Sequence, residues 1–366
     1  MERLKTIEVR VGDKLVIGGG APVVVQTMCN THTSDVEATV SQCLGLAAAG
    51  AQMIRITVPG MQDVPALAEI RRRLHEAGCF TPLVADIHFS SDTAIACAEV
   101  VEKVRINPGN FHPDHETARR KFSEFLEVCR RHGTAVRVGL NHGSLGKYIT
   151  ELYGNTPYAM AKAAMEWLQM CIDASFFNVV VSLKASNTVV MVQAYRELVK
   201  LMKESGHIFP LHLGVTEAGL PGQGTVKSAI GIGALLADGI GDTIRVSLSG
   251  DPVPEAAAAW DILRALNLRV RGVQLIACPT CGRTCIPVEA IARRVEKELA
   301  DVTVPLKVAV MGCVVNGLGE GREADVGIAG GKTGGVLFIR GQEPRRVEGD
   351  LAEQLIREVR KMVGEK

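Results

Sequence analysis

The fold follows from a unit that is clearest in residues 53–88, MIRITVPGMQDVPALAEIRRRLHEAGCFTPLVADIH. Two β-branched apolar runs, at 53–58 and 83–88, flank a stretch of helical period, DVPALAEIRRRLHEAG. That stretch opens on Asp and closes on Gly, which are favoured just before and just after a helix. A strand, a helix and a second strand within roughly 35 residues are typical of a βα repeat.

The same pattern extends in both directions from this unit. Between residues 23 and 243 the starts of the apolar runs advance in seven steps of about 31 residues, the size of one βα unit. The eight runs are 23–28, 53–58, 83–88, 101–108, 135–141, 178–186, 211–219 and 243–250. Eight units predict a closed (β/α)₈ TIM-type barrel, because the alternative, a doubly wound open sheet, usually stops at fewer strands.

The pattern changes at both ends of the chain. TIEVRVGDKLVIGGG (6–20) is typical of a short hairpin. From about residue 268 the chain continues as VQLIACPTCGRTC, a helical stretch, a further apolar run and a final helical stretch. We therefore expect residues 1–267 to form the barrel and residues 268–366 to form a small α+β domain.

The composition limits the function classes. The chain has 366 residues, 41 Lys and Arg against 40 Asp and Glu, and a formal net charge of +1. Aromatic residues make up 4%, which leaves few platforms for stacking on nucleic acid. The sequence contains no signal-peptide pattern and no run of 18 apolar residues. We expect a cytoplasmic protein that binds neither nucleic acid nor membrane.

Five of the eight predicted strands carry a cation between small or apolar neighbours, and barrel active sites lie at the carboxyl ends of the strands. Burying five unpaired cations would be costly. The pattern therefore predicts an anionic ligand with several charges, such as a phosphate or diphosphate. Asn141 and Ser247 are expected as additional donors. The cations are Arg55, Arg105, Arg137, Lys184 and Arg245.

Two carboxylates end predicted strands nearby. Asp86 and His88 end the third run, and Glu217 ends the seventh. The alternative to an anionic ligand is internal ion pairing, but two carboxylates cannot neutralise five cations. Asp86 and Glu217 are candidate catalytic groups, and a purely structural role in the ion network remains open for both.

Ten cysteines fall into two groups. Most of the six in the barrel are expected to be buried filler. In the tail, Cys278 and Cys281 form a Cys-x₂-Cys turn, and Cys313 opens a Gly-rich loop after an apolar run. This arrangement is typical of a metal or iron–sulfur site, with structural zinc or a redox dithiol as alternatives. Cys285 and Glu320 are both candidates for a fourth ligand.

Several long motifs, in order, resemble the bacterial two-domain family of 4-hydroxy-3-methylbut-2-enyl diphosphate synthases. They are KVRINPGN (103–110), RVGLNHGS (137–144), SLKAS (182–186), GVTEAG (214–219), ACPTCGR (277–283) and VMGCVVNGLGEGREADVGIAGG (310–331). The resemblance covers essentially the whole chain.

The resemblance implies site residues by position. It implies a 4Fe–4S cluster held by Cys278, Cys281, Cys313 and Glu320, with Cys285 as a bystander. It implies that the barrel cations, with Asn141 and Ser247, bind a cyclic diphosphate, and that Asp86 and Glu217 lie at the reacting end.

The resemblance also implies the reaction, which is reductive ring opening of 2-C-methyl-D-erythritol 2,4-cyclodiphosphate with loss of a hydroxyl as water. Two electrons would come from reduced flavodoxin or ferredoxin, and the enzyme would be a homodimer. One alternative is an aldolase-type barrel enzyme with Lys184 as the Schiff-base residue and a structural zinc in the tail. A non-enzymatic zinc module is the weakest hypothesis, because the chain lacks a basic, aromatic-rich character.

Overall fold

The computed structural model describes residues 2–315, 319, 323–331 and 333–364, and the chain divides into two compact units, Met1–Arg269 and Val270–Lys366. The division lies two residues beyond the expected boundary at 267/268. No helix in the described part of the chain is long and apolar enough to cross a membrane.

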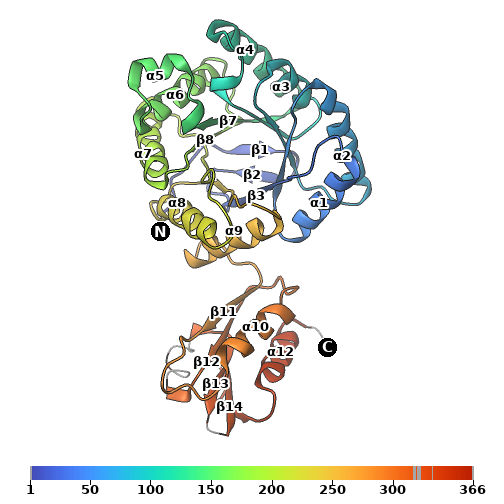
Figure 1. Ribbon diagram of the computed structural model, residues 1–366, viewed down its shortest axis with the longest axis vertical. Helices are drawn as coiled ribbons and strands as arrows, with labels where there is room; N and C mark the ends of the chain where they lie inside the picture. The colour runs from blue at the N-terminus through green and yellow to red at the C-terminus, as the bar shows by residue number, and fades with distance from the viewer. Residues whose placement is uncertain (1, 316–318, 320–322, 332, 365–366) are drawn as a thin grey trace. The chain divides into compact units, whose positions relative to one another are not determined.

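The first unit contains eight parallel strands arranged in a ring, with helices around them (Figure 1). The hydrogen-bonded order is β8-β7-β6-β5-β4-β3-β10-β9. A parallel bridge between Val181 and Leu211 joins the two ends of this order, so the sheet closes on itself. The strands are β3 (Val24–Met28), β4 (Met53–Thr57), β5 (Leu83–Ile87), β6 (Lys103–Ile106), β7 (Ala135–Asn141), β8 (Val179–Lys184), β9 (His212–Leu213) and β10 (Thr243–Ile244).

Helices follow the strands, and several begin at a side chain that accepts a hydrogen bond from a backbone N–H of the first turn. These N-caps are Asp35, Ser90, Asp114, Thr156 and Asn187. Such caps satisfy N–H groups that a helix leaves unpaired. The helices are α1 (Val36–Ala48), α2 (Val64–Glu76), α3 (Ser91–Ala98), α4 (His115–His132), α5 (Lys147–Tyr153), α6 (Pro157–Asp173), α7 (Thr188–Ser205), α8 (Gln223–Ala237) and α9 (Val253–Ala265).

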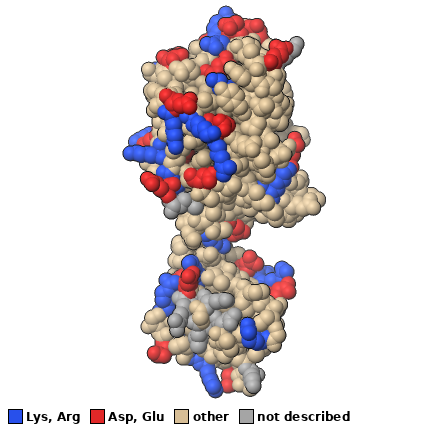
Figure 2. Space-filling view, turned by 90° about the vertical axis from the view of Figure 1, so that its left-hand side faces the viewer, with Lys and Arg blue, Asp and Glu red and all other residues tan. Residues whose placement is uncertain are grey.

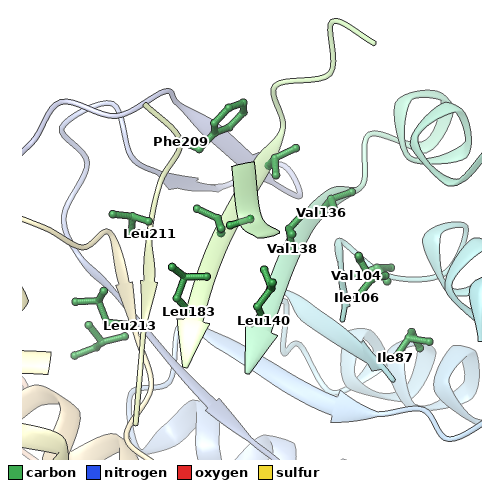
Figure 3. Packing of buried hydrophobic residues seen from close by; sticks show 14 of the residues in the cluster. Ile87, Val104, Ile106, Val136, Val138, Leu140, Leu183, Phe209, Leu211 and Leu213 are labelled. Carbon is green, nitrogen blue, oxygen red and sulfur yellow. The ribbon is translucent and has the colours of Figure 1, made fainter. Parts of the chain in front are cut away.

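Alternate residues of each strand pack outward against the helices. Figure 3 shows this outer core, with Val104 and Ile106 from β6, Val136, Val138 and Leu140 from β7, and Leu183 from β8. Because side chains alternate along a strand, the residues between them point into the barrel. Sequence alternation alone therefore separates an apolar outer face from the inner face that carries the cations.

The amino-terminal end of the barrel is closed by the predicted hairpin. Strands β1 (Val9–Val11) and β2 (Leu15–Ile17) are antiparallel, and their apolar side chains pack on the first inward residues of five barrel strands. This cluster contains Val9, Val11, Ile17, Val24, Met53, Val84, Ala135 and Val180. The inner face is thus apolar at this end and charged toward the other.

The second unit is a five-stranded mixed sheet in the order β11-β12-β13-β14-β15, with β11, β12 and β13 parallel. The strands are β11 (Val273–Ala277), β12 (Leu306–Met311), β13 (Val326–Gly331), β14 (Gly334–Ile339) and β15 (Arg345–Val347). Helices α10 (Val288–Glu298) and α12 (Leu351–Met362) pack with these strands in one apolar core.

The TIM-type barrel predicted from the repeat is confirmed, with a small α+β unit after it. The last two barrel strands are much shorter than the predicted runs 211–219 and 243–250. After Leu213 and Ile244 the chain leaves the strand ladder, and residues 215, 216, 245 and 247 line a cavity instead.

Candidate functional site

The predicted cations converge on one small cavity at the carboxyl ends of the barrel strands. The cavity has a volume of about 60 Å³. All five predicted cations and both predicted donors, Asn141 and Ser247, line it. The full lining is Arg55, His88, Arg105, Arg137, Asn141, Ser182, Lys184, Val215, Thr216, Arg245 and Ser247.

Asp86 is the carboxylate that organises one side of this cavity. Its Oδ1 accepts a hydrogen bond from Arg105 Nη1 at 3.0 Å, and its Oδ2 lies 3.6 Å from Arg55 Nη2. Burial alone would raise the pKa of Asp86, but the charges of Arg55, Arg105 and Arg137 hold that pKa well below its usual value. Asp86 is therefore an ionised anchor for two guanidinium groups.

His88 lies beside the same pair. Its Nε2 is 2.6 Å from Arg105 Nη1 and 3.7 Å from Asp86 Oδ2. Burial and the neighbouring arginine charges lower the pKa of His88, which outweighs the effect of Asp86. The neutral imidazole can accept the hydrogen bond from the guanidinium.

Buried positive charge dominates the rest of the cavity. Burial and the neighbouring arginines hold the pKa values of Arg137 and Lys184 well below their usual ranges. Burial likewise lowers the pKa of Arg55 to about 9, against the opposing effect of Asp86. Each of these groups is destabilised in its charged form, and a bound anion would relieve that cost.

Arg245 is paired by a carboxylate that the sequence pattern did not identify. Glu255, in the first turn of α9, lies 3.3 Å from Arg245 Nη2 and also accepts from Leu248 N–H at 2.9 Å and Thr27 Oγ1 at 3.2 Å. Because Glu255 lies on a helix, the pattern of polar residues at the strand ends does not include it. The signal that could have found it is its place in the first turn of the helix that follows the predicted run 243–250, which contains Arg245.

Glu217, the second predicted carboxylate, lies outside the cavity lining. It follows β9 by four residues, its side chain is exposed, and its backbone has φ +53°. The alternative of internal ion pairing had Asp86 and Glu217 as its carboxylates. Asp86 does pair with Arg55 and Arg105, whereas the carboxylate beside Arg245 is Glu255.

Two glycines allow the cations to approach the strands. A Cβ on Gly139 would lie 2.6 Å from Arg105 Nε, and one on Gly214 would lie 2.9 Å from Lys184 Nζ. Arg105 Nη2 also donates to Gly139 O at 2.9 Å. A residue with a side chain at either position would displace a cation.

In the second unit, Cys278 follows β11 directly, and Cys313 lies two residues beyond the neighbouring parallel strand β12. Cys278 Sγ accepts a hydrogen bond from Gly312 N–H at 3.0 Å. Hydrogen bonds to sulfur are among the features that tune iron–sulfur sites. The pairing of these strands therefore brings two of the three predicted thiol ligands to one edge of the sheet.

Cys281 is exposed in the turn. A hydrogen bond from the backbone N–H of Arg283 lowers the pKa of the Cys281 thiol, and the Arg283 charge and Thr284 act in the same direction. A stabilised thiolate is the form that binds iron. Cys285, also exposed, donates from its backbone N–H to Gly312 O at 2.8 Å.

Glu320 lies outside the described residues. Among those described, no group of three His, Cys, Asp or Glu side chains is close enough to hold a metal ion. The donor types and their placement on adjacent loops still fit an iron–sulfur cluster. The expected filler cysteines, Cys43, Cys97, Cys129 and Cys171, are buried in the barrel.

Over the described residues on the face in Figure 2, acidic and basic side chains lie interspersed in small groups. This agrees with the net charge of +1. Positive charge is instead concentrated inside the barrel.

Solved structures resemble the barrel only distantly. Dihydropteroate synthase of Yersinia pestis has a TM-score of 0.49 and 11% identity, covering 72% of this chain and 100% of its own. Such a low similarity does not bear on function.

Curated relatives are much more similar. The 4-hydroxy-3-methylbut-2-en-1-yl diphosphate synthase (flavodoxin) of Geobacter sulfurreducens is 46% identical, covering 100% of this chain and 99% of its own. The protein of the same name from Caldanaerobacter subterraneus subsp. tengcongensis is 45% identical, covering 99% of each chain.

Family models match both parts of the chain. Residues 6–260 match the GcpE TIM-barrel domain, and residues 274–361 match the GcpE protein C-terminal domain. The resemblance stated from the sequence motifs is confirmed, and the chain belongs to the GcpE family.

Proposed function

We propose that the cationic cavity of the barrel is where this protein binds and opens a cyclic diphosphate. The protein is an iron–sulfur oxidoreductase of isoprenoid biosynthesis, a 4-hydroxy-3-methylbut-2-enyl diphosphate synthase, as its relatives are. Its reaction is the reductive ring opening of 2-C-methyl-D-erythritol 2,4-cyclodiphosphate. The observation that carries the assignment of the site is the excess of buried cations over carboxylates at the cavity.

The guanidinium groups have distinct tasks in this proposal. Arg105 and Arg55 are held in place by Asp86, so their remaining N–H groups are directed without loss of side-chain entropy on binding. Within the described residues, Arg137 Nε and Nη1 have no hydrogen-bond partner. Buried donors of this kind are normally satisfied, and the phosphoryl oxygens of the substrate would satisfy them.

Lys184, Arg245, Asn141 and Ser247 complete the substrate site. Lys184 and Arg245 add charge, while Asn141 and Ser247 offer neutral donors at the cavity wall. Because Glu255 already neutralises part of the charge of Arg245, Lys184 and Arg137 contribute the larger uncompensated charge.

The two candidate catalytic carboxylates lie in different environments, since Asp86 is buried and Glu217 is exposed. Asp86 stays ionised, so it positions Arg55 and Arg105 and does not donate a proton at neutral pH. We assign the proton-delivering role to Glu217, because it is exposed on the loop after β9, where solvent can reprotonate it.

We assign a 4Fe–4S cluster to Cys278, Cys281, Cys313 and Glu320. When bound, the cluster would deliver electrons to the substrate and offer one iron held by an exchangeable carboxylate. The chain's own contribution is the hydrogen bond from Gly312 to Cys278 and the stabilised thiolate of Cys281.

Reduced flavodoxin is the proposed electron donor, because the relatives carry flavodoxin in their names, and ferredoxin is the other candidate. A homodimer in the cytoplasm is part of the same proposal.

The test is anaerobic analysis of iron and sulfide, followed by turnover of the cyclic diphosphate with reduced flavodoxin. About four irons per chain and formation of the linear diphosphate are expected. A folded, colourless protein that holds one zinc and turns over no cyclic diphosphate would contradict the assignment. Glu320→Cys should retain the iron but lose most turnover, because a thiolate would occupy the exchangeable position.

The aldolase-type alternative is disfavoured by the family assignment. Its specific test is borohydride trapping with a carbonyl substrate, which should leave Lys184 unmodified.

A further inference from the structure

Lys103 is a sixth cation inside the barrel and is absent from the lining of the substrate cavity. It starts β6 and lies two residues before Arg105, so both side chains share the inner face of the strand. Val104 and Ile106, between and after them, point outward into the core between barrel and helices (Figure 3). Lys103 is 0% exposed.

Several inward residues of the barrel, this lysine among them, have polar atoms without hydrogen-bond partners. Within the described part of the chain, Lys103 Nζ, His212 Nε2 and both amide atoms of Gln26 have no hydrogen-bond partner, as is true of Arg137 Nε and Nη1. Gln26, Lys103, Arg137 and His212 all lie on inward positions of barrel strands. Buried groups left without partners are uncommon in native proteins, and such a set indicates a layer that is completed by something else.

The protonation of Lys103 and His212 depends on whether an anion occupies the substrate cavity. Burial and the neighbouring charge of Arg137 hold the pKa of Lys103 well below its usual range. Burial, together with Arg137, Lys184, Lys103 and Arg55, likewise lowers the pKa of His212. Because Lys103 is fully buried and its Nζ has no hydrogen-bond partner among the described residues, the ammonium form is disfavoured, and a nearby anion would favour it.

We infer that Lys103 is a charge-compensating positioning residue of the substrate site, which takes up a proton when the anionic substrate binds. This inference rests on the proposed function. The cyclic diphosphate carries one ionised oxygen on each phosphorus, hence two negative charges. The step is a transfer of one proton from solvent to the ε-amino group, which becomes an ammonium without any change of covalent bonds in the substrate.

The other charged and titratable groups inside the barrel must be considered as alternative sites for this proton. Asp86 and Glu255 are already ionically paired, and Arg55, Arg105 and Arg245 are their partners. His88 accepts from Arg105. Within the described part of the chain, Lys103, Lys184 and His212 have no carboxylate partner, and burial together with the charge of Arg137 lowers the pKa of each.

The experiment is calorimetric titration of the full-length, anaerobically purified protein with the cyclic diphosphate, in buffers of different ionisation enthalpy. The dependence of the heat on the buffer gives the number of protons taken up. The unaltered protein should take up protons when it binds the cyclic diphosphate. Lys103→Met should take up about one proton fewer and bind on the order of tenfold more weakly.

The unfolding temperature of the ligand-free protein distinguishes this role from a purely structural one, because the two roles predict changes of opposite sign. A lysine kept for packing would destabilise the protein when replaced. Lys103→Met should instead raise the unfolding temperature of the ligand-free protein, because it removes an unpaired buried amine while keeping an unbranched side chain. Lys103→Gln provides a second variant, and exposed Lys200→Met on α7 is the matched control, expected to match the unaltered protein in both measurements.

The outcomes separate the inference from the function on which it depends. Equal proton uptake by the unaltered protein and both Lys103 variants would overturn the inference while leaving the proposed function intact. If the unaltered protein bound no cyclic diphosphate, the proposed function itself would be overturned.

Discussion

Arg105 Nη1 donates a 3.0 Å hydrogen bond to Asp86 Oδ1, and the two residues are direct partners across the neighbouring parallel strands β6 and β5. The register of the sheet thus places a carboxylate beside a guanidinium in the barrel interior. The pair, with Arg55 on the other carboxylate oxygen, forms the rigid wall of the proposed substrate site.

Asp86→Asn should destabilise the protein by about 3 kcal/mol, because it leaves Arg55 and Arg105 buried without their anion. The folded-state pKa of Asp86 lies below its unfolded value, so its stabilising contribution is present above roughly pH 4 and is lost as the pH falls through the folded pKa. Denaturant unfolding at neutral and acidic pH measures this. The difference between variant and unaltered protein should shrink in acid, whereas Asp92→Asn, on the surface of α3, should have little effect at either pH.

Glu255→Gln should lower stability by about 2 kcal/mol, because Glu255 accepts from Arg245, Leu248 N–H and Thr27. The same change frees the charge of Arg245, so binding of the cyclic diphosphate should become tighter or stay equal. Unfolding and calorimetry together test this. A loss of binding without a loss of stability would assign Glu255 a direct role at the substrate.

Glu217→Gln is the complementary variant. Because Glu217 is exposed, its replacement should leave stability within about 0.5 kcal/mol of the unaltered protein. Turnover should fall at least about a hundredfold with little change in substrate affinity, since general acids typically contribute that much. Steady-state kinetics with reduced flavodoxin measure this, and full turnover in the variant would remove Glu217 from the catalytic assignment.

Gly139→Ala should weaken substrate binding by roughly tenfold or more, because the new Cβ would lie 2.6 Å from Arg105 Nε and force the guanidinium from its place. Iron content should stay unchanged. Gly45→Ala is the matched control, because a Cβ at this position of α1 meets nothing within 4 Å. Equal affinity in both variants would mean that Arg105 does not act from its observed position.

Cys281 should be the fastest cysteine to react with iodoacetamide in the cluster-free protein. It is exposed, and the backbone N–H and charge of Arg283 lower its pKa, so its thiolate persists to lower pH than that of an ordinary cysteine. Mass spectrometry after limited alkylation checks this. Reconstitution with iron and sulfide should protect Cys281, and continued rapid labelling would exclude it as a ligand.

The alternation of side chains along the predicted strands was sufficient to predict the barrel and five cations that line its cavity. The same alternation also places Lys103, two residues before Arg105, on the inner face, but at the start of its strand and not at the carboxyl end. Glu217 lies outside the cavity lining for a physical reason. The ladder ends at Leu213, so the following residues form a loop and no longer follow the strand's alternation.

The periodicity of the strands could not predict Glu255, because this residue lies in the first turn of helix α9. In the second unit, sequence spacing identified Cys278 and Cys313, and the parallel pairing of β11 with β12 explains why their loops meet. The role of Cys285 and the identity of the fourth ligand depend on loop geometry that spacing does not determine.

The most direct test of the central claim is the dissociation constant of the cyclic diphosphate for the unaltered protein and Arg137→Met, measured anaerobically beside iron content. Arg137 is fully buried at the cavity and has unsatisfied donors within the described structure. The account predicts binding weakened by on the order of tenfold to a hundredfold with iron content unchanged. Equal affinity in the two proteins, at equal iron content, would contradict the assignment of the barrel cavity as the substrate site.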